Sequence, residues 1–228
     1  MIVFGTKFLS DSTRRPLKYM GYPYYKSEWT DLKSDKEHPH VYNIEMSPGM
    51  VFARHFHRSP EFQIVIGGSG SISGEEVSIG SIHFASAYCV YGPLIAGPEG
   101  LSYLTMRLEF DDSVLYSGDH DSNAVQGIVH AQKYTLSKTT EVALDVKNEA
   151  RLFVVKIGKG ETHNLGEGTE KSSRLVVVLN GSVSFGSRAL NKWEHMFVGA
   201  DNNVELKSQG GDAQIGILQF PNRLKKIQ

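Results

Sequence analysis

Short runs of apolar residues, separated by turn residues, dominate the pattern of hydrophobic and polar positions along the chain. Each run is rich in β-branched, leucine and aromatic residues and is bounded by Gly, Pro, Ser, Asn or Asp, as is typical of β-strands. The expected strands are Val41–Met46, Phe62–Ile66, Leu101–Phe110, Leu152–Ile157, Leu175–Leu179 and Ile215–Phe220. Many short strands joined by glycine-rich turns predict an all-β sandwich or barrel.

Stretches with the 3.6-residue period of a helix are scarce. The best candidate is Thr139–Ala150, but Val142, Leu144 and Val146 alternate along it. This alternation favours a strand, which agrees with an all-β chain.

The chain also contains an internal repeat. Glu61–Gly74 and Arg174–Gly186 both read as an apolar strand, a glycine turn and then alternating small and apolar residues. Aligning Gly68 with Gly181 gives an offset of 113 residues, and aligning Gly70 with Gly181 gives 111. The repeat predicts two tandem copies of one β module.

This repeat divides the 228 residues into four parts. The expected parts are an N-terminal arm (1–35), a first barrel (36–112), a connecting segment (113–145) and a second barrel (146–228). The arm is rich in tyrosine, and we expect it to pack on a barrel or on a partner subunit.

Composition narrows the function classes. With 24 basic and 25 acidic residues the formal net charge is −1, which argues against a nucleic acid partner. A single cysteine excludes an internal disulfide and any CxxC metal framework. Because the chain has neither a membrane-spanning apolar run nor a secretory leader pattern, we expect a cytoplasmic protein that does not bind membranes.

One segment carries chemistry. His55 and His57 are two residues apart, so on a strand their side chains point to the same face and can converge on one metal ion. Glu61 is a further even step away. Two histidines and a carboxylate with open positions are typical of a non-haem Fe(II) site, and Mn, Ni, Co, Cu or Zn would also fit.

The spacing around these residues resembles the first motif of the cupin superfamily. Gly49, five residues, His55, one residue, His57, three residues, Glu61, six residues and Gly68 match every defined position of that motif. The duplication resembles the two-barrel bicupins. The resemblance implies two tandem jelly-roll barrels (double-stranded β-helices), with His55, His57 and Glu61 as three of four metal ligands in the first.

The second cupin motif departs from the family pattern. Counting from Gly80, Ser86 stands at the proline position, Tyr88 at the second glycine and Tyr91 at the histidine. Tyr91 is therefore a fourth ligand, a residue of the pocket or a packing aromatic. His83 is the nearest spare imidazole and an alternative ligand or pocket residue.

Strand parity adds further pocket candidates. Gln63 shares the parity of Glu61 and points inward if the strand is regular. Along Leu101–Phe110, Tyr103 and Arg107 lie on one face and apolar residues on the other. If the first face is interior, Arg107 is placed to clamp a substrate carboxylate or enolate; if the apolar face is interior, Arg107 is solvated.

The second barrel lacks the ligand set. At an offset of 113 the three ligand positions become Gly168, Glu170 and Arg174, without a histidine. His163 and His195 lack spaced partners. We therefore expect a structural or dimerising copy without a metal site.

These features predict a metal-dependent enzyme that acts on a small organic molecule. The expected reaction is that of an Fe(II) dioxygenase, with Tyr91 and Arg107 as catalytic candidates. The alternatives are isomerisation, decarboxylation or hydrolysis without O₂, and a non-catalytic protein that binds a sugar or an effector. A storage or structural bicupin is a third reading. Exposed barrel edges and the aromatic arm favour a homodimer.

Overall fold

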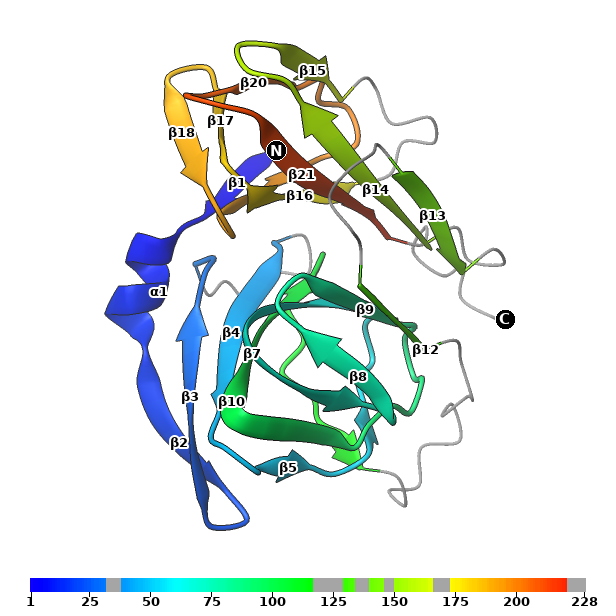
Figure 1. Ribbon diagram of the computed structural model, residues 1–228. Coiled ribbons are helices and arrows are strands. Elements are labelled where there is room, and N and C mark those ends of the chain that lie inside the picture. The colour runs from blue at the N-terminus through cyan, green and yellow to red at the C-terminus, as the bar shows by residue number, and fades with distance from the viewer. Residues whose placement is uncertain (32–37, 117–128, 134–139, 146–149, 166–172, 221–228) are drawn as a thin grey trace, which may run out of the picture. The chain divides into compact units, whose positions relative to one another are not determined.

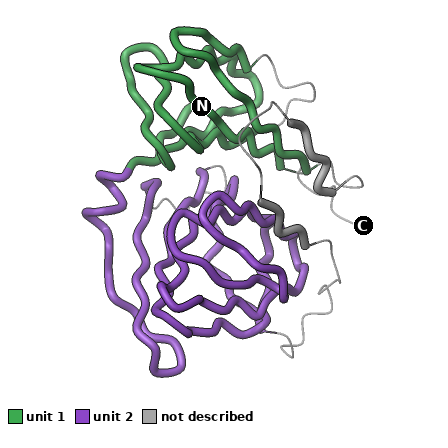
Figure 2. The backbone as a smooth tube through the Cα atoms, viewed as in Figure 1, with its two compact units in different colours: residues 1–6, 135–228 green, residues 7–134 purple. Residues whose placement is uncertain are grey.

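The computed structural model describes residues 1–31, 38–116, 129–133, 140–145, 150–165 and 173–220. These residues divide into two compact units, shown in Figure 2: unit 1 comprises residues 1–6 and 135–228, and unit 2 comprises residues 7–134. The described part of the chain is β-structure apart from α1 (Lys7–Thr13). No helix in that part is long and apolar enough to cross a lipid bilayer.

Unit 2 is built on a nine-stranded antiparallel sheet, which Figure 1 shows rolled up rather than flat. The strand order is β12-β9-β7-β10-β4-β3-β2, with β5 paired to β10 and β8 paired to β7. A separate two-stranded pair joins β6 to β11. The bounds are β2 (Arg15–Tyr19), β3 (Tyr22–Glu28), β4 (His40–Met46), β5 (Val51–Phe52), β6 (His55–Phe56), β7 (Glu61–Ile72), β8 (Glu75–Ser78), β9 (Ser81–Ala85), β10 (Leu94–Arg107), β11 (Leu115–Tyr116) and β12 (Val129–Lys133).

The N-terminal residues are distributed over both units. β2 and β3 form a hairpin through Met20 and Gly21, whose φ angles of 49° and 88° suit a two-residue turn between twisted strands. β3 also pairs with β4, so the hairpin extends the sheet of unit 2. β1 (Ile2–Gly5) instead pairs with β19 of unit 1.

β10 begins at Leu94, seven residues before the strand expected at Leu101. Pairing with β7 is interrupted between Ala96 and Leu101, where Gly97, Pro98 and Gly100 lie. An irregular stretch tolerates these residues, because proline has no N–H to give to a ladder and glycine adopts bulge conformations. Glycine and proline therefore concealed the first half of a long strand.

Unit 1 contains a six-stranded sheet in the order β1-β19-β16-β21-β14-β13 and a four-stranded sheet in the order β15-β20-β17-β18. Its remaining bounds are β13 (Thr140–Asp145), β14 (Ala150–Ile157), β15 (Thr162–Asn164), β16 (Arg174–Asn180), β17 (Ser182–Phe185), β18 (Arg188–Asn191), β19 (His195–Val198), β20 (Glu205–Ser208) and β21 (Ala213–Gln219). The preference for strand over helix along Thr139–Ala150 agrees with β13 and with the start of β14; Thr139 and residues 146–149 lie outside the described residues.

The predicted glycine repeat has a structural basis. Gly68 follows the apolar half of β7 at φ 67°, and Gly181 follows β16 at φ 70°. A Cβ atom would lie 2.1 Å from the Gly100 carbonyl oxygen at Gly68, and 2.5 Å from the Asp212 carbonyl oxygen at Gly181. Both positions therefore require glycine for conformation and for close backbone approach.

We predict that Gly68→Ala and Gly181→Ala each destabilise the fold more than Gly74→Ala, measured by urea unfolding. Gly74 also has a positive φ of 88°, but a Cβ there meets nothing within 4 Å. Gly74→Ala should therefore show the conformational cost alone, about 1–2 kcal/mol. Equal losses at all three positions would contradict the role assigned to the backbone contacts.

Candidate functional site

The two histidines of the motif lie beside Tyr91 in unit 2. His55 is on β6 and forms an isolated backbone bridge with Tyr91. The ring centroids of His55 and Tyr91 are 4.6 Å apart, and those of His55 and His57 are 5.2 Å apart. Both imidazoles are buried, with exposed fractions of 8% and 5%.

Backbone carbonyls fix the orientation of both imidazoles. Nδ1 of His55 donates to the carbonyl of Ala53 over 2.7 Å, and Nδ1 of His57 donates to the carbonyl of Ser113. Burial lowers the pKa of His55, and it lowers the pKa of His57 to about 4. At neutral pH both rings are therefore neutral with the proton on Nδ1, which leaves the lone pair of each Nε2 for a ligand.

Glu61 begins β7 and is almost completely buried. Its Oε2 accepts hydrogen bonds from Nε and Nη2 of Arg107, over 3.0 and 2.6 Å. Burial favours the neutral acid, but interactions with His57 and Arg107 and a hydrogen bond from Tyr91 outweigh it and lower the pKa of Glu61 to about 2. Glu61 is therefore an ion compensated by buried partners.

Tyr91 is hydrogen-bonded to the carboxylate of Glu61. Its hydroxyl donates to Oε1 of Glu61 over 2.6 Å and accepts from Nε2 of Gln63 over 3.0 Å. Burial and the charge of Glu61 raise the pKa of Tyr91 well above its usual value, so the phenol keeps its proton. The Oε2 of Glu61 also lies 3.9 Å from Nε2 of His57.

A cavity of about 310 Å³ in unit 2 brings most of the predicted site residues together. The members of the predicted set that line it are His55, His57, Gln63, Tyr91, Tyr103 and Arg107. Glu61 and His83 do not line it. Glu61 holds Arg107 and Tyr91 from outside the wall, and the ring of His83 lies 5.1 Å from that of Tyr91.

β10 presents its polar face to the cavity. Tyr103, Thr105 and Arg107 line the wall, whereas Leu104 and Met106 are fully buried on the opposite face. The guanidinium of Arg107 also donates through Nη1 to the carbonyl of Asp111. With Nε and Nη2 on Glu61, the structure gives Arg107 a positioning role toward that carboxylate.

Asp111 closes the site on the side of the histidine motif. Its Oδ2 accepts from the backbone N–H groups of Arg58 and Ser59 and from the Ser59 hydroxyl, over 2.8–3.0 Å. Its Oδ1 accepts from the N–H and hydroxyl of Ser113. Burial opposes ionisation, but the hydrogen bonds from Ser113 and the charge of Arg107 lower the pKa of Asp111 to about 2. Asp111 therefore ties the turn after His57 to the residue that orients its ring.

One wall of the cavity was missed in the sequence. The β2–β3 hairpin contributes Arg15, Leu17 and Tyr19 from one strand and Tyr24 and Lys26 from the other. These residues alternate in steps of two, so a period-two search of the N-terminal segment would have found one face of two strands. Treating the segment as an arm concealed that signal.

A second buried carboxylate lies at the end of β3, two residues after Lys26 and on the same face of the strand. Glu28, 2% exposed, is 3.0 Å from Arg15, 3.3 Å from Lys26 and 3.4 Å from His40. Burial opposes ionisation, but the close contact with His40, the charge of Lys26 and the hydrogen bond from Arg15 lower the pKa of Glu28 to about 2. Burial also lowers the pKa of His40.

No family model matches the chain, and no curated protein matches it. Solved structures do match over most of its length. The bacterial pirin YhhW from Escherichia coli, in complex with nickel(II), has a TM-score of 0.66 at 12% identity and covers 98% of this chain and 100% of its own. A candidate dioxygenase from Nostoc punctiforme has a TM-score of 0.65 at 13% identity, with 100% and 81% covered.

A variant of oxalate decarboxylase from Bacillus subtilis has a TM-score of 0.62 at 14% identity, with 93% of this chain and 76% of that chain covered. These matches are cupin-fold proteins. The chain has the cupin fold. The predicted all-β class and the resemblance to cupins are therefore confirmed, and the likeness concerns the fold.

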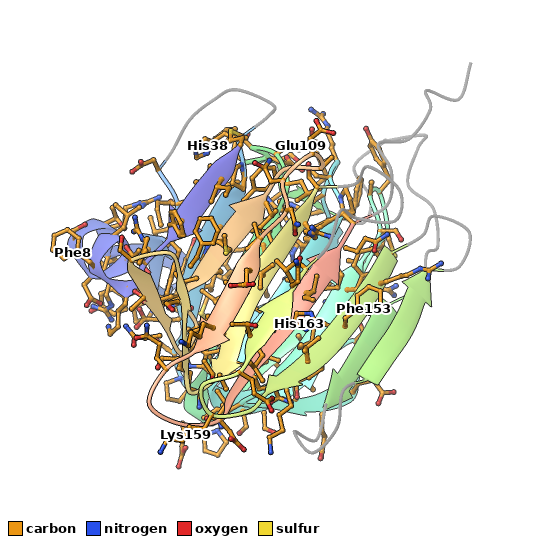
Figure 3. The ribbon with its side chains drawn as sticks, turned by 90° about the horizontal axis from the view of Figure 1, so that it is seen from above. Phe8, His38, Glu109, Phe153, Lys159 and His163 are labelled. Carbon is orange, nitrogen blue, oxygen red and sulfur yellow. The ribbon has the colours of Figure 1, made fainter. Side chains whose placement is uncertain are left out.

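The region of unit 1 that corresponds to the histidine motif by sequence offset is described only in part. Gly168 and Glu170, which correspond to His55 and His57 at an offset of 113, lie outside the described residues, and Arg174 begins β16. His195 is fully buried on β19, where its Nδ1 donates to the carbonyl of Trp193 over 3.3 Å. His163 lies on β15 and is labelled in Figure 3.

We predict that Glu61→Gln destabilises the protein by about 3–5 kcal/mol in urea unfolding, because it leaves the buried charge of Arg107 uncompensated. The double variant Glu61→Gln/Arg107→Met should recover part of that loss. As a control, Asp212→Asn removes the exposed pair with Lys156 and should leave the unfolding midpoint unchanged. A loss for Glu61→Gln no larger than the control's would contradict the assignment.

A second prediction concerns acid unfolding. The folded pKa of Glu28, about 2, lies below its usual 4.5, so the ionised group stabilises the fold above about pH 4.5. This contribution is lost as the pH falls from 4.5 toward 2. Glu28→Gln should flatten the stability profile over that range, whereas Glu75→Gln, at an exposed position on β8, should keep the wild-type profile.

Proposed function

We propose that the protein is a metal-binding cupin enzyme that acts on a small organic molecule in the cavity of unit 2. The observation that carries the proposal is the pair of neutral imidazoles of His55 and His57, both oriented by carbonyls and both lining the cavity. The matched pirin structure holds nickel(II), and a matched oxalate decarboxylase structure concerns Mn(II) centres, which supports a divalent ion.

The donor set fits such an ion in kind. Two imidazole nitrogens and the nearby carboxylate of Glu61 are the ligands of a two-histidine, one-carboxylate centre. Within the described residues, no three His, Cys, Asp or Glu side chains already stand as a ligand cluster. Both oxygens of Glu61 are engaged by Arg107 and Tyr91, so Glu61 would have to exchange one of these hydrogen bonds to bind an ion.

His55 and His57 would hold the ion, with Glu61 as third ligand. When bound, a divalent ion supplies Lewis-acid polarisation of a substrate oxygen and, if redox-active, the electron transfer that dioxygenation requires. Arg107 positions Glu61, and Gln63 directs the hydroxyl of Tyr91 to the same carboxylate. Among reactions of this class we favour an Fe(II) dioxygenase, and the resemblance of the chain's fold to a candidate dioxygenase supports that choice.

The second candidate function is non-catalytic binding of a small molecule in the same cavity. It is favoured by the compensation of Glu61 by Arg107, which satisfies the carboxylate without a metal ion. The two functions differ in metal content.

Elemental analysis of the purified protein tests the proposal. The wild type should carry about one divalent ion per chain, and His55→Ala/His57→Ala should lose it. His163→Ala removes a histidine of unit 1 and should keep the wild-type content. A wild type that stays metal-free after incubation with Fe(II), Mn(II) and Ni(II) would contradict the proposed metal-dependent enzyme. Non-catalytic binding of a small molecule would then be the remaining candidate function.

Oxygen uptake then tests the reaction. A metal-loaded protein should consume O₂ with a member of a panel of catechols, flavonols and β-diketones, and the double histidine variant should not. Metal binding without uptake across the panel would contradict the dioxygenase assignment and favour isomerisation, decarboxylation or hydrolysis.

A further inference from the structure

A second group of polar side chains lines the cavity on the β2–β3 hairpin. Arg15 and Lys26 are cross-strand partners, so their side chains leave the hairpin on the same face. Both line the cavity. Arg15 is 44% exposed and Lys26 is 19% exposed, which places Arg15 nearer the solvent and Lys26 deeper.

The buried carboxylate of Glu28 holds these two cations but does not neutralise both. Glu28 lies within 3.3 Å of each and does not line the cavity. Its third partner, His40, has a pKa lowered by burial and is neutral at pH 7. Among these groups, two cations face one carboxylate, which leaves one positive charge in excess. The other carboxylates of the lining are Asp111, which is hydrogen-bonded to Ser59 and Ser113, and Asp112.

Lys26 is the cation of this pair with which an anion in the cavity would interact most favourably. Its ammonium lies 4.0 Å from the ring centroid of Tyr42, and burial lowers its pKa although Glu28 opposes that shift. The ammonium has therefore lost more solvation than its partners restore. An anionic group arriving from the cavity would supply the missing compensation.

The neighbouring walls are aromatic. Tyr19 and Tyr24 pack against Phe52 with ring centroids 4.9 and 5.4 Å apart, and all three line the cavity. The rings are tilted by 60° and 85° to one another, and aromatic side chains in such an arrangement can contact both the face and the edge of a planar apolar ring. A volume of about 310 Å³ stands at the lower end of the range of about 300–1,000 Å³ for small-molecule pockets, which favours a single ring.

We propose that Arg15 and Lys26 form an anion subsite that binds the carboxylate of a single-ring aromatic acid. The ring lies among the tyrosines, and its other end is directed to the part of the cavity lined by His55 and His57. This inference names the substrate class of the proposed enzyme and so rests on the proposed function. The anion subsite itself requires only Arg15, Lys26 and the carboxylate that holds them.

The test compares 4-hydroxybenzoate with its uncharged analogue 4-hydroxybenzamide by titration calorimetry on the full chain. The wild type should bind the acid at least about tenfold more tightly than the amide, the ratio expected for a charged hydrogen bond. Arg15→Gln/Lys26→Gln should lower this ratio to about one. Lys18→Gln, an exposed lysine of the same hairpin, should keep it.

Lys26→Arg distinguishes charge from folding. This variant keeps the cation and should keep the preference for the acid, while far-ultraviolet circular dichroism confirms that each variant is folded. Equal affinity for acid and amide in the wild type, no binding of either at millimolar concentration, or a preference retained by the double glutamine variant would each overturn the subsite.

The titrations are carried out on protein treated with a chelator and repeated after loading with Fe(II). A preference for the acid in the chelator-treated protein supports the subsite even if no metal is ever bound, in which case the proposed enzyme fails alone. Stoichiometric metal with no preference for the acid overturns the subsite and leaves the metal proposal standing.

Discussion

Glu61 and Arg107 are both almost fully buried, and two ions can lie there only because each compensates the other. Much of the cavity wall depends on this pair. Arg107 fixes the carboxylate from one side and Tyr91 from the other, and Gln63 directs the hydroxyl of Tyr91. The pair also joins β7 to β10, the two longest strands of the unit. The chemistry of the pocket and the packing of the sheet therefore meet in one interaction.

The fold was largely predictable because its signals are local. Each of the six strands expected from apolar runs overlaps an observed strand, although β10 ends at Arg107 rather than Phe110 and β21 at Gln219 rather than Phe220. The repeated glycine turn corresponds to two backbones that approach too closely for a Cβ atom. The strand predictions failed where the local residue types disfavour a strand but pairing with distant strands forms one. Gly97 and Pro98 are residue types that regular strands avoid, yet β10 continues through them because its pairing with β7 is irregular there. The tyrosine-rich hairpin extends the sheet through its pairing with β4, and this tertiary pairing is not encoded in the local pattern of the N-terminal segment.

The candidate site was predictable where spacing alone decides geometry. Two histidines two residues apart share a face on a strand, and the structure places both rings on the cavity, although β6 ends at Phe56 and His57 follows it. The face of Arg107 could not be deduced, because alternation reveals an interior only when the other face is solvated. On β10 both faces are buried, with Leu104 and Met106 on one and Thr105 and Arg107 on the other. Lys26 and Arg15 escaped notice since their partner Glu28 matters only after the hairpin has joined the sheet.

Glu28 and Glu61 share one placement: each is buried outside the cavity and holds basic or hydroxyl groups that line it. The residues that line the cavity include arginine, lysine, tyrosine, histidine and aspartate but neither Glu28 nor Glu61, so a molecule there would meet Glu61 only through a metal ion that this carboxylate helps to hold. A mutagenesis screen for altered ligand preference that substitutes only the residues lining the cavity would therefore omit these two carboxylates, although they position the lining side chains. During evolution, ligand preference in such a barrel can change through substitutions that no ligand ever touches.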